Sequence, residues 1–121
     1  MPNFRIVALV DDDEEIRGAM KGLLRSYGVE ICAYETAEAF LERANFEAIG
    51  CLITDLHMPG IGGLKLLKLL RRRGVAFPII VMSAREGAQA AAEAHGADAY
   101  ISKPLDGDEL MGWLVRLGTR T

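Results

Sequence analysis

The feature that most constrains the fold is an alternation of short apolar runs with amphipathic helical segments, repeated five times along the chain. The apolar runs are too short for helices and rich in β-branched residues, which is typical of strands buried on both faces of a parallel sheet. The predicted strands cover residues 6–10, 29–34, 49–54, 79–82 and 99–101. The second of these alternates apolar with polar residues, which indicates an edge strand.

Each predicted strand is followed by a segment with helical spacing of its apolar residues. In the first helix this stripe is Ile16, Met20, Leu23, Leu24 and Tyr27. Thr36 is a candidate N-cap for the second helix, the third carries the leucines of residues 64–70, and the last two cover residues 86–95 and 106–117. This order predicts one α/β domain over residues 1–121, a doubly wound (βα)5 unit whose parallel sheet is covered by helices through right-handed crossovers.

Charge and composition argue against several classes of protein. The chain has 14 Lys and Arg against 17 Asp and Glu, so it lacks the basic footprint of a free-standing nucleic-acid binder. Its longest charge-free stretch, residues 74–84, is far shorter than the roughly 18 residues of a membrane span. No export signal opens the chain, and we expect a cytoplasmic protein in which Cys32 and Cys51 are small buried thiols.

Polar side chains that can bind ions or take part in reactions follow four of the predicted strands. Asp11 and Asp12 follow the first strand, Asp55 the third, Ser83 the fourth and Lys103 the fifth. Ligands of open α/β sheets collect beyond the carboxyl ends of the strands, so we expect these side chains to converge at one edge. The second strand ends in no such residue, as suits an edge strand.

The convergence predicts a phosphoryl site built on a carboxylate. Close carboxylates repel one another unless a cation lies among them, and a few hard oxygen ligands suit Mg²⁺. An opposing lysine and hydroxyl would bind the oxygens of an arriving phosphoryl group. Taken singly, each residue has a simpler interpretation: acids at a helix start cap it or offset its dipole, which we assign to residues 13–15. A lone Ser83 is often an N-cap, and a lone Lys103 is a surface lysine.

Four segments, in order and at the proper distances, resemble the receiver domain of two-component response regulators. Residues 10–17 resemble the acidic pocket of the family, and residues 54–59 followed by Gly63 resemble its D-x-x-M-P-x-x-x-G phosphoacceptor segment. Ser83-Ala84 resembles the switch Ser/Thr, and residues 96–104 resemble the G-A-x-x-[YF]-x-x-K-P ending. Thr54-Asp55-Leu56 and residues 37–40 are most similar to receivers of FixJ/NarL-type transcriptional regulators.

This resemblance implies a flavodoxin-like sheet in strand order 2-1-3-4-5 and a set of roles at the site. Asp55 would be the phosphoacceptor, and Lys103 would pair with the phosphoryl oxygens. Mg²⁺ would be bound by Asp12, Asp55 and the backbone carbonyl of His57, with Asp11 acting mainly through bound water.

The resemblance also implies a switch and a set of partners. Ser83 and Tyr100 would move on phosphorylation, and Pro104 would follow a cis peptide bond as a structural residue. The phosphodonor would be a sensor histidine kinase or phosphotransfer protein. Helix 86–95, strand 99–101 and helix 106–117 would form the output face, which would control transcription through an output domain or a partner, or form a homodimer.

On this interpretation the domain is a signalling module rather than an enzyme, although it assists its own phosphorylation and dephosphorylation. It would contact neither nucleic acid nor a membrane. Met111 and Val115 lie off the inward stripe of the last helix and are candidate contact residues. His57 and Arg85 depart from the commonest family pattern, and both should border the site and tune the phosphoryl lifetime.

Two alternatives remain open at this point. A haloacid-dehalogenase-like phosphatase would use Asp11 as nucleophile with Asp13, Ser83 and Lys103, but this leaves Asp55 without a role. A pseudo-receiver would have the fold without phosphorylation. The residues do not decide whether the domain acts alone or belongs to a transcription factor, and they do not identify the kinase.

Overall fold

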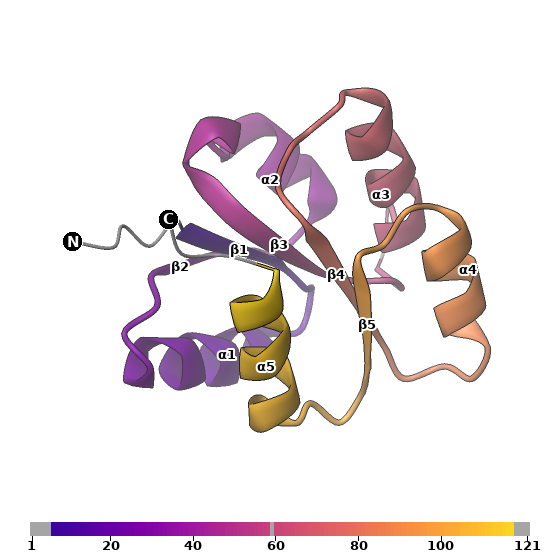
Figure 1. Ribbon diagram of the computed structural model, residues 1–121. Coiled ribbons are helices and arrows are strands. Elements are labelled where there is room, and N and C mark those ends of the chain that lie inside the picture. Colours follow the sequence, from indigo (N-terminus) through magenta and orange to yellow (C-terminus); the bar gives the residue numbers. More distant parts are fainter. Residues whose placement is uncertain (1–5, 59, 118–121) are drawn as a thin grey trace.

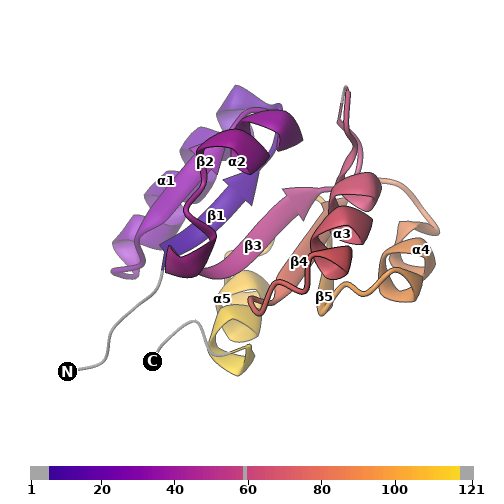
Figure 2. The same ribbon diagram turned by 90° about the horizontal axis from the view of Figure 1, so that it is seen from above.

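The computed structural model describes residues 6–58 and 60–117, and these form a five-stranded parallel sheet between two layers of helices (Figure 1). The strand order is β2-β1-β3-β4-β5, so the predicted fold class and topology are confirmed. The strands are β1 (Ile6–Val10), β2 (Ile31–Tyr34), β3 (Ile49–Asp55), β4 (Ile79–Ser83) and β5 (Ala99–Ser102). The arrowheads of β1 and β3 point to the same edge of the sheet, where the chain passes into its loops (Figure 2).

The helices divide between the two faces of the sheet. Helices α1 (Glu14–Ser26) and α5 (Gly107–Arg116) lie on one face, and α2 (Ala37–Arg43), α3 (Gly63–Arg72) and α4 (Ala88–Ala94) lie on the other (Figure 1). A short 3-10 helix, η1 (Phe46–Ala48), leads into β3. Each crossover from one parallel strand to the next therefore contains a helix, as the alternating pattern predicts.

Local side-chain caps explain where several helices begin. The Asp13 carboxylate accepts hydrogen bonds from the backbone N–H groups of Glu15 and Ile16 at the start of α1. Thr36 caps α2 by accepting from the N–H of Ala39 at 3.0 Å, as predicted. These contacts satisfy N–H groups that have no partner within the helix. The acids of residues 13–15 are thus used at the helix start, in line with their assignment.

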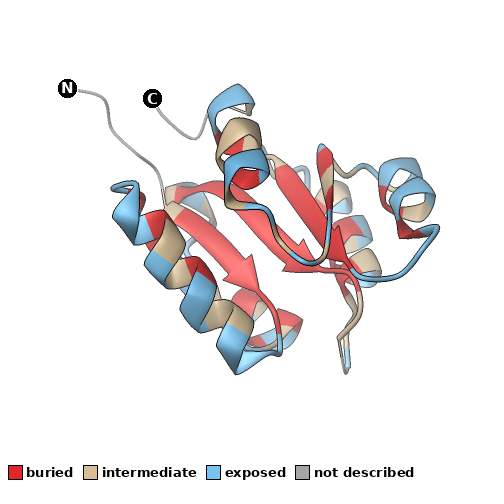
Figure 3. Ribbon diagram, turned by 90° about the horizontal axis from the view of Figure 1, so that it is seen from below, coloured by how far each residue is buried: buried red, intermediate tan, exposed pale blue. Residues whose placement is uncertain are grey.

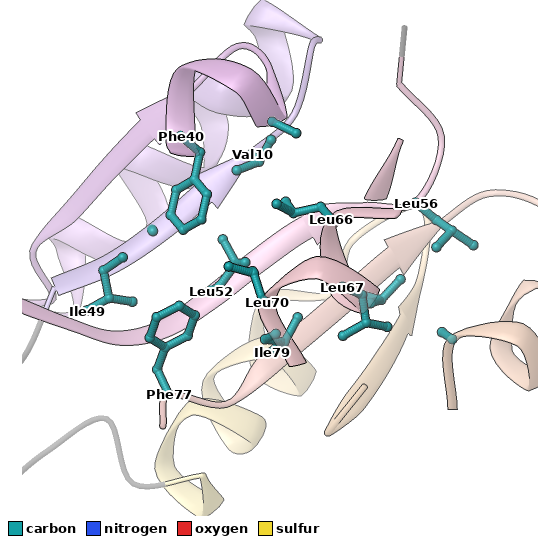
Figure 4. Packing of buried hydrophobic residues seen from close by; sticks show 14 of the residues in the cluster. Val10, Phe40, Ile49, Leu52, Leu56, Leu66, Leu67, Leu70, Phe77 and Ile79 are labelled. Atoms are coloured by element: carbon teal, nitrogen blue, oxygen red, sulfur yellow. The ribbon is translucent and has the colours of Figure 1, made fainter. Parts of the chain in front are cut away.

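The core consists of two apolar clusters, one on each face of the sheet. The central strands are buried along their length, whereas the outer faces of the helices are exposed (Figure 3). Side chains of β1, β3 and β4 pack against leucines of α3 and the ring of Phe40 on one face (Figure 4). Phe40 stacks on Phe46 at 5.3 Å between ring centroids, and Phe46 meets Phe77 edge-on at 5.9 Å. This packing fixes the strands whose ends carry the polar residues.

Several sequence predictions need correction. Cys51 is buried as predicted, but Cys32 is exposed because its strand, β2, lies at the edge of the sheet. Tyr27 is 51% exposed, because α1 ends at Ser26 and the stripe ends with it. Helix α4 covers only residues 88–94 of the predicted 86–95, and β2 lacks the first two predicted residues. Pro59 and residues 118–121 lie outside the described residues.

A polar anchor holds the opposite end of the sheet from the predicted site. The Asp98 carboxylate accepts a hydrogen bond from the backbone N–H of Ile79 at 2.7 Å and pairs with the guanidinium of Arg71. Arg71 also donates from Nε to the carbonyl oxygen of Gly96 at 2.9 Å. The start of β4, the loop before β5 and the last turn of α3 are thereby joined.

Within the part of the chain that the structure describes, every helix is too short or too polar to span a bilayer.

Candidate functional site

The polar residues predicted from the strand ends lie at the carboxyl edge of the sheet, above its central strands. Asp11 directly follows β1, and Asp55 is the last residue of the neighbouring strand β3. Both carboxylates are buried, Asp11 at 0% exposure and Asp55 at 7%. Parallel pairing of β1 with β3, in which Val10 lies opposite Thr54, brings the two carboxylates side by side.

Lys103 bridges the two buried carboxylates. Its Nζ lies 3.2 Å from Oδ2 of Asp11 and 3.0 Å from Oδ2 of Asp55. The lysine is brought there by β5, because its backbone N–H donates to the Ser83 carbonyl oxygen at the end of β4. Two charge-assisted hydrogen bonds therefore hold one ammonium group between the acids.

Burial and neighbouring charges shift the pKa values of Asp11 and Lys103. Burial raises the pKa of Asp11 above its ordinary value, although the hydrogen bond from the Asp13 N–H and the charge of Lys103 oppose that shift. Burial lowers the pKa of Lys103, but the hydrogen bond to Asp55 and the charges of Asp11 and Asp55 outweigh it, so the lysine pKa is raised. The lysine is consequently charged in neutral solution, and it compensates only part of the local negative charge.

Backbone groups orient both carboxylates. Oδ1 of Asp11 accepts from the N–H of Asp13 at 2.9 Å, and Oδ1 of Asp55 accepts from the N–H of His57 at 3.2 Å. Arg17, a residue that the sequence analysis did not single out, donates from Nη1 to the Asp11 carbonyl oxygen at 2.8 Å. Only its place in the first turns of α1 distinguishes Arg17 from other surface arginines, which is a weak signal.

The acids meet the requirements of a site for a hard divalent cation. Asp11, Asp12 and Asp55 each offer a carboxylate oxygen, and these three atoms lie within 4.8 Å of one another. Asp12 is exposed, so one ligand faces the solvent from which an ion would enter. One lysine compensates the two buried acids only in part, and excess negative charge with oxygen ligands is the chemistry that Mg²⁺ compensates.

The loop after β3 closes tightly over the strand end at Gly63, the first residue of α3. A Cβ atom at this position would lie 2.1 Å from the Asp55 carbonyl oxygen and 2.8 Å from Cα of Leu56. The N–H of Gly63 also donates to the Leu56 carbonyl oxygen at 3.0 Å. Only glycine lets α3 begin so close to the strand that carries Asp55, which explains the glycine of the quoted motif.

His57 and Arg85 border the site, as the sequence analysis predicts. They line a pocket of about 430 Å³ together with Leu56, Met58 and two glycines of the loop. The Nε2 atom of His57 is buried and has no hydrogen-bond partner among the described residues. Among the described residues, the potential metal ligands that cluster here are the carboxylates of Asp11, Asp12 and Asp55, and the imidazole of His57 is not one of them.

Ser83 and Tyr100 line a separate pocket of about 180 Å³ at the ends of β4 and β5. The buried Ser83 hydroxyl accepts from the N–H of Arg85 at 3.1 Å, and among the described residues it makes no hydrogen bond to Asp55 or Lys103. The Tyr100 hydroxyl lies 3.4 Å from the Ser83 carbonyl oxygen, and its ring is half-buried. The Lys103–Pro104 peptide bond is cis, as expected.

Comparison with known proteins gives a consistent match over this whole region. A sequence profile of the family described as "Response regulator receiver domain" matches residues 7–114. The Transcriptional regulatory protein FixJ of Azorhizobium caulinodans is 39% identical over 108 residues, which cover 88% of this chain and 51% of FixJ. The DNA-binding transcriptional regulator NtrC of Escherichia coli K12 is 35% identical over 113 residues, or 92% of this chain and 24% of NtrC.

Solved structures agree with the sequence matches. The response regulator StyR superposes with a TM-score of 0.86 at 31% identity, covering 95% of this chain and 59% of that one. Full-length FixJ from B. japonicum superposes with a TM-score of 0.80 at 31% identity, covering 93% of this chain and 58% of that one. The chain thus spans about half the length of the FixJ proteins that it matches.

Proposed function

The chain belongs to the response regulator receiver domain family, and we propose that Asp55 is its phosphoacceptor. A carboxylate oxygen of Asp55 attacks the phosphorus of a phosphohistidine on a sensor kinase or phosphotransfer protein. A P–O bond forms as the P–N bond breaks, and the donor imidazole keeps the electron pair and takes a proton from solvent. The observation that supports this role is that Asp55 is buried at a strand end, fixed by the His57 N–H and paired with Lys103.

Lys103 is the residue that compensates charge on the transferred group. Its ammonium already lies 3.0 Å from Oδ2 of Asp55, so an oxygen of a phosphoryl group bound to that carboxylate would fall within its reach. Preorganised charge of this kind stabilises developing negative charge without further reorganisation. The cis peptide at Pro104 follows directly and is proposed to be structural.

Receiver domains of this family use Mg²⁺ at their acidic pocket, and the donor set here fits it. Asp11, Asp12 and Asp55, with the backbone carbonyl of His57, would hold the ion, Asp11 mainly through bound water. When bound, Mg²⁺ neutralises charge on phosphoryl oxygens and so lets an anionic donor approach three acids. The protein itself supplies the orientation of Asp55 and the positive charge of Lys103.

The switch would act on Ser83 and Tyr100. Phosphorylation adds roughly −1.5 to −2 charge units and three acceptor oxygens. The Ser83 hydroxyl, which now accepts from Arg85 N–H, would instead donate to a phosphoryl oxygen, and Tyr100 would turn inward beside it. The population shifts toward the rearranged loop only to the extent that phosphorylated Asp55 interacts better with that loop than with the present one.

The output would be read from the face formed by α4, β5 and α5. Val115 on α5 is 74% exposed and available for contacts, whereas Met111 is half-buried. We propose that this face controls an output domain or a partner in transcription, or pairs with a second copy. The domain would act as a signalling module without direct contact to nucleic acid, and its cytoplasmic location stays a prediction.

The experiment that tests the assignment is peptide mapping by mass spectrometry after incubation with a small-molecule phosphodonor and Mg²⁺. We expect one phosphoryl adduct on Asp55, absent in Asp55→Asn and retained in the control Asp106→Asn, where asparagine can still cap α5. An adduct on Asp11 would favour the phosphatase alternative, and no adduct at all the pseudo-receiver. The phosphatase alternative is not favoured, because the Asp13 carboxylate is occupied in capping α1.

A further inference from the structure

The outer surface of α3 carries a groove that the proposed phosphoryl chemistry does not use. The α3 groove has a volume of about 500 Å³ and is lined by Gly62, Leu64, Lys65, Lys68, Leu69 and Arg72. Helix α3 lies between α2 and α4 on one face of the sheet (Figure 2). The face opposite the groove, with Leu66, Leu67 and Leu70, is buried against the core.

The cations of this groove make no contact that would stabilise the domain by pairing charges among the described residues. Lys65, Lys68 and Arg72 are exposed, lie at helical spacing on one side of α3, and take part in none of the ion pairs among the described residues. No acidic residue occurs in α3. Lys65 lies in the first turn, where the helix dipole disfavours positive charge, and like charges at this spacing weaken a helix. Such a row points to an external anionic ligand.

The apolar part of the groove distinguishes between anionic ligands. Leu64 and Leu69 are half-buried and line the groove beside the row of cations. A nucleic-acid backbone would match the cations but would leave this apolar surface without a partner. An amphipathic helix with leucine-like residues on one face and acids along its edges matches both parts. The domain itself has a net charge of −3, so this basic surface stands out from its surroundings.

The α3 groove adjoins the pocket beside the loop that follows Asp55. Gly62 lines both this groove and the pocket of about 430 Å³ that His57 and Arg85 border. A partner bound to the groove would therefore meet the loop that follows Asp55 at Gly62. We propose that the α3 groove is a docking surface for an acidic amphipathic helix of a partner protein.

Binding of a defined probe tests this proposal without any phosphorylation, so its failure is distinct from failure of the phosphoacceptor assignment. The probe is a synthetic helical peptide with leucines on one face and glutamates on the other, titrated at low salt and followed by NMR shifts of the α3 amides. We expect saturable binding centred on Leu64, Lys65 and Leu69. Lys65→Glu/Lys68→Glu should weaken binding by about tenfold, because attraction is replaced by repulsion at two positions.

The matched control is Lys21→Glu/Arg25→Glu on α1, which changes the net charge equally at cations that are also free of ion pairs among the described residues. It should change the affinity by less than about twofold, because α1 lies on the other face of the sheet, and distant surface charges are screened. Equal loss in both variants, or no binding to the wild-type protein, would overturn the proposal. So would equal affinity for a peptide with the same residues in scrambled order, or for duplex DNA.

Discussion

Replacement of Gly63 by alanine should destabilise the domain, because the new methyl group has no room. Its Cβ would lie 2.1 Å from the Asp55 carbonyl oxygen, and real Cβ atoms essentially never approach closer than 3.0 Å. The start of α3 or the end of β3 would have to move by almost an ångström. The nearest atoms are all backbone, so no side chain can turn away to relieve the contact.

The expected cost has two parts. Overpacking of a tight contact costs ~1–3 kcal/mol, and disturbing the hydrogen bond from Gly63 N–H to the Leu56 carbonyl oxygen costs ~1 kcal/mol more. We therefore expect a loss of about 2–4 kcal/mol in the free energy of unfolding. With a urea m-value of ~2 kcal/mol/M, in the middle of the usual range, the unfolding midpoint should fall by about 1–2 M.

Urea unfolding followed by circular dichroism measures this change, and the chain supplies its own controls. Gly18 and Gly22 lie within α1, and a Cβ at either would meet nothing within 4 Å. Alanine at these positions should stabilise the protein by about 0.5–1 kcal/mol, because glycine is the poorer helix former. A Gly63→Ala variant that is as stable as the wild type would refute the steric reasoning.

Three further predictions follow from the site and the caps. Mg²⁺ at a hundredfold excess over its Kd should stabilise the wild type by ~2.7 kcal/mol and so raise its melting temperature. Asp12→Asn should remove most of this rise; calorimetry with and without the ion measures it, and an unchanged rise would exclude Asp12 as a ligand. Because burial raises the pKa of Asp11 above 3.8, this residue binds more protons in the folded state than in the unfolded chain between pH 3.8 and the raised value. The contribution of Asp11 to stability should therefore fall as the pH rises through this window. Asp11→Asn should lack that contribution in urea titrations without divalent cations; a difference between the two proteins that does not vary with pH would contradict it. Thr36→Ala should cost ~1 kcal/mol by removing the hydrogen bond to the N–H of Ala39, whereas Thr36→Ser should be nearly neutral; equal losses in thermal unfolding would show that the cap is not the cause.

The fold was predictable because its signals are local and repeated. Every strand has a run of apolar residues, and the alternation with helical segments leaves few topologies. Errors occur where exposure depends on the position of an element in the sheet, as for Cys32 on the edge strand β2. Tyr27 was also placed wrongly in the buried stripe of α1, because the helix ends at Ser26 and Tyr27 is its exposed C-cap.

The site was predictable in its members but not in all its contacts. Strand ends in a parallel sheet meet at one edge, so Asp11, Asp55 and Lys103 could be placed together from the sequence. The hydrogen bond from Arg17 to the Asp11 carbonyl oxygen depends on how the loop folds, and no residue pattern encodes it. The bond from Arg85 N–H to the Ser83 hydroxyl likewise depends on the turn after β4 rather than on residue type.

The anchor at Asp98 determines how α4 is able to move. The segment that follows this helix is tied down by Arg71 at Gly96 and by the carboxylate of Asp98, whereas its first turn follows Gly87 without a side-chain cap. Displacement of α4 would thus be a tilt about a pivot near residues 96–98, rather than a translation along the sheet. Its amplitude would be greatest at the uncapped end that follows Gly87, so a small change beside Ser83 would become a larger one at the exposed surface of the helix.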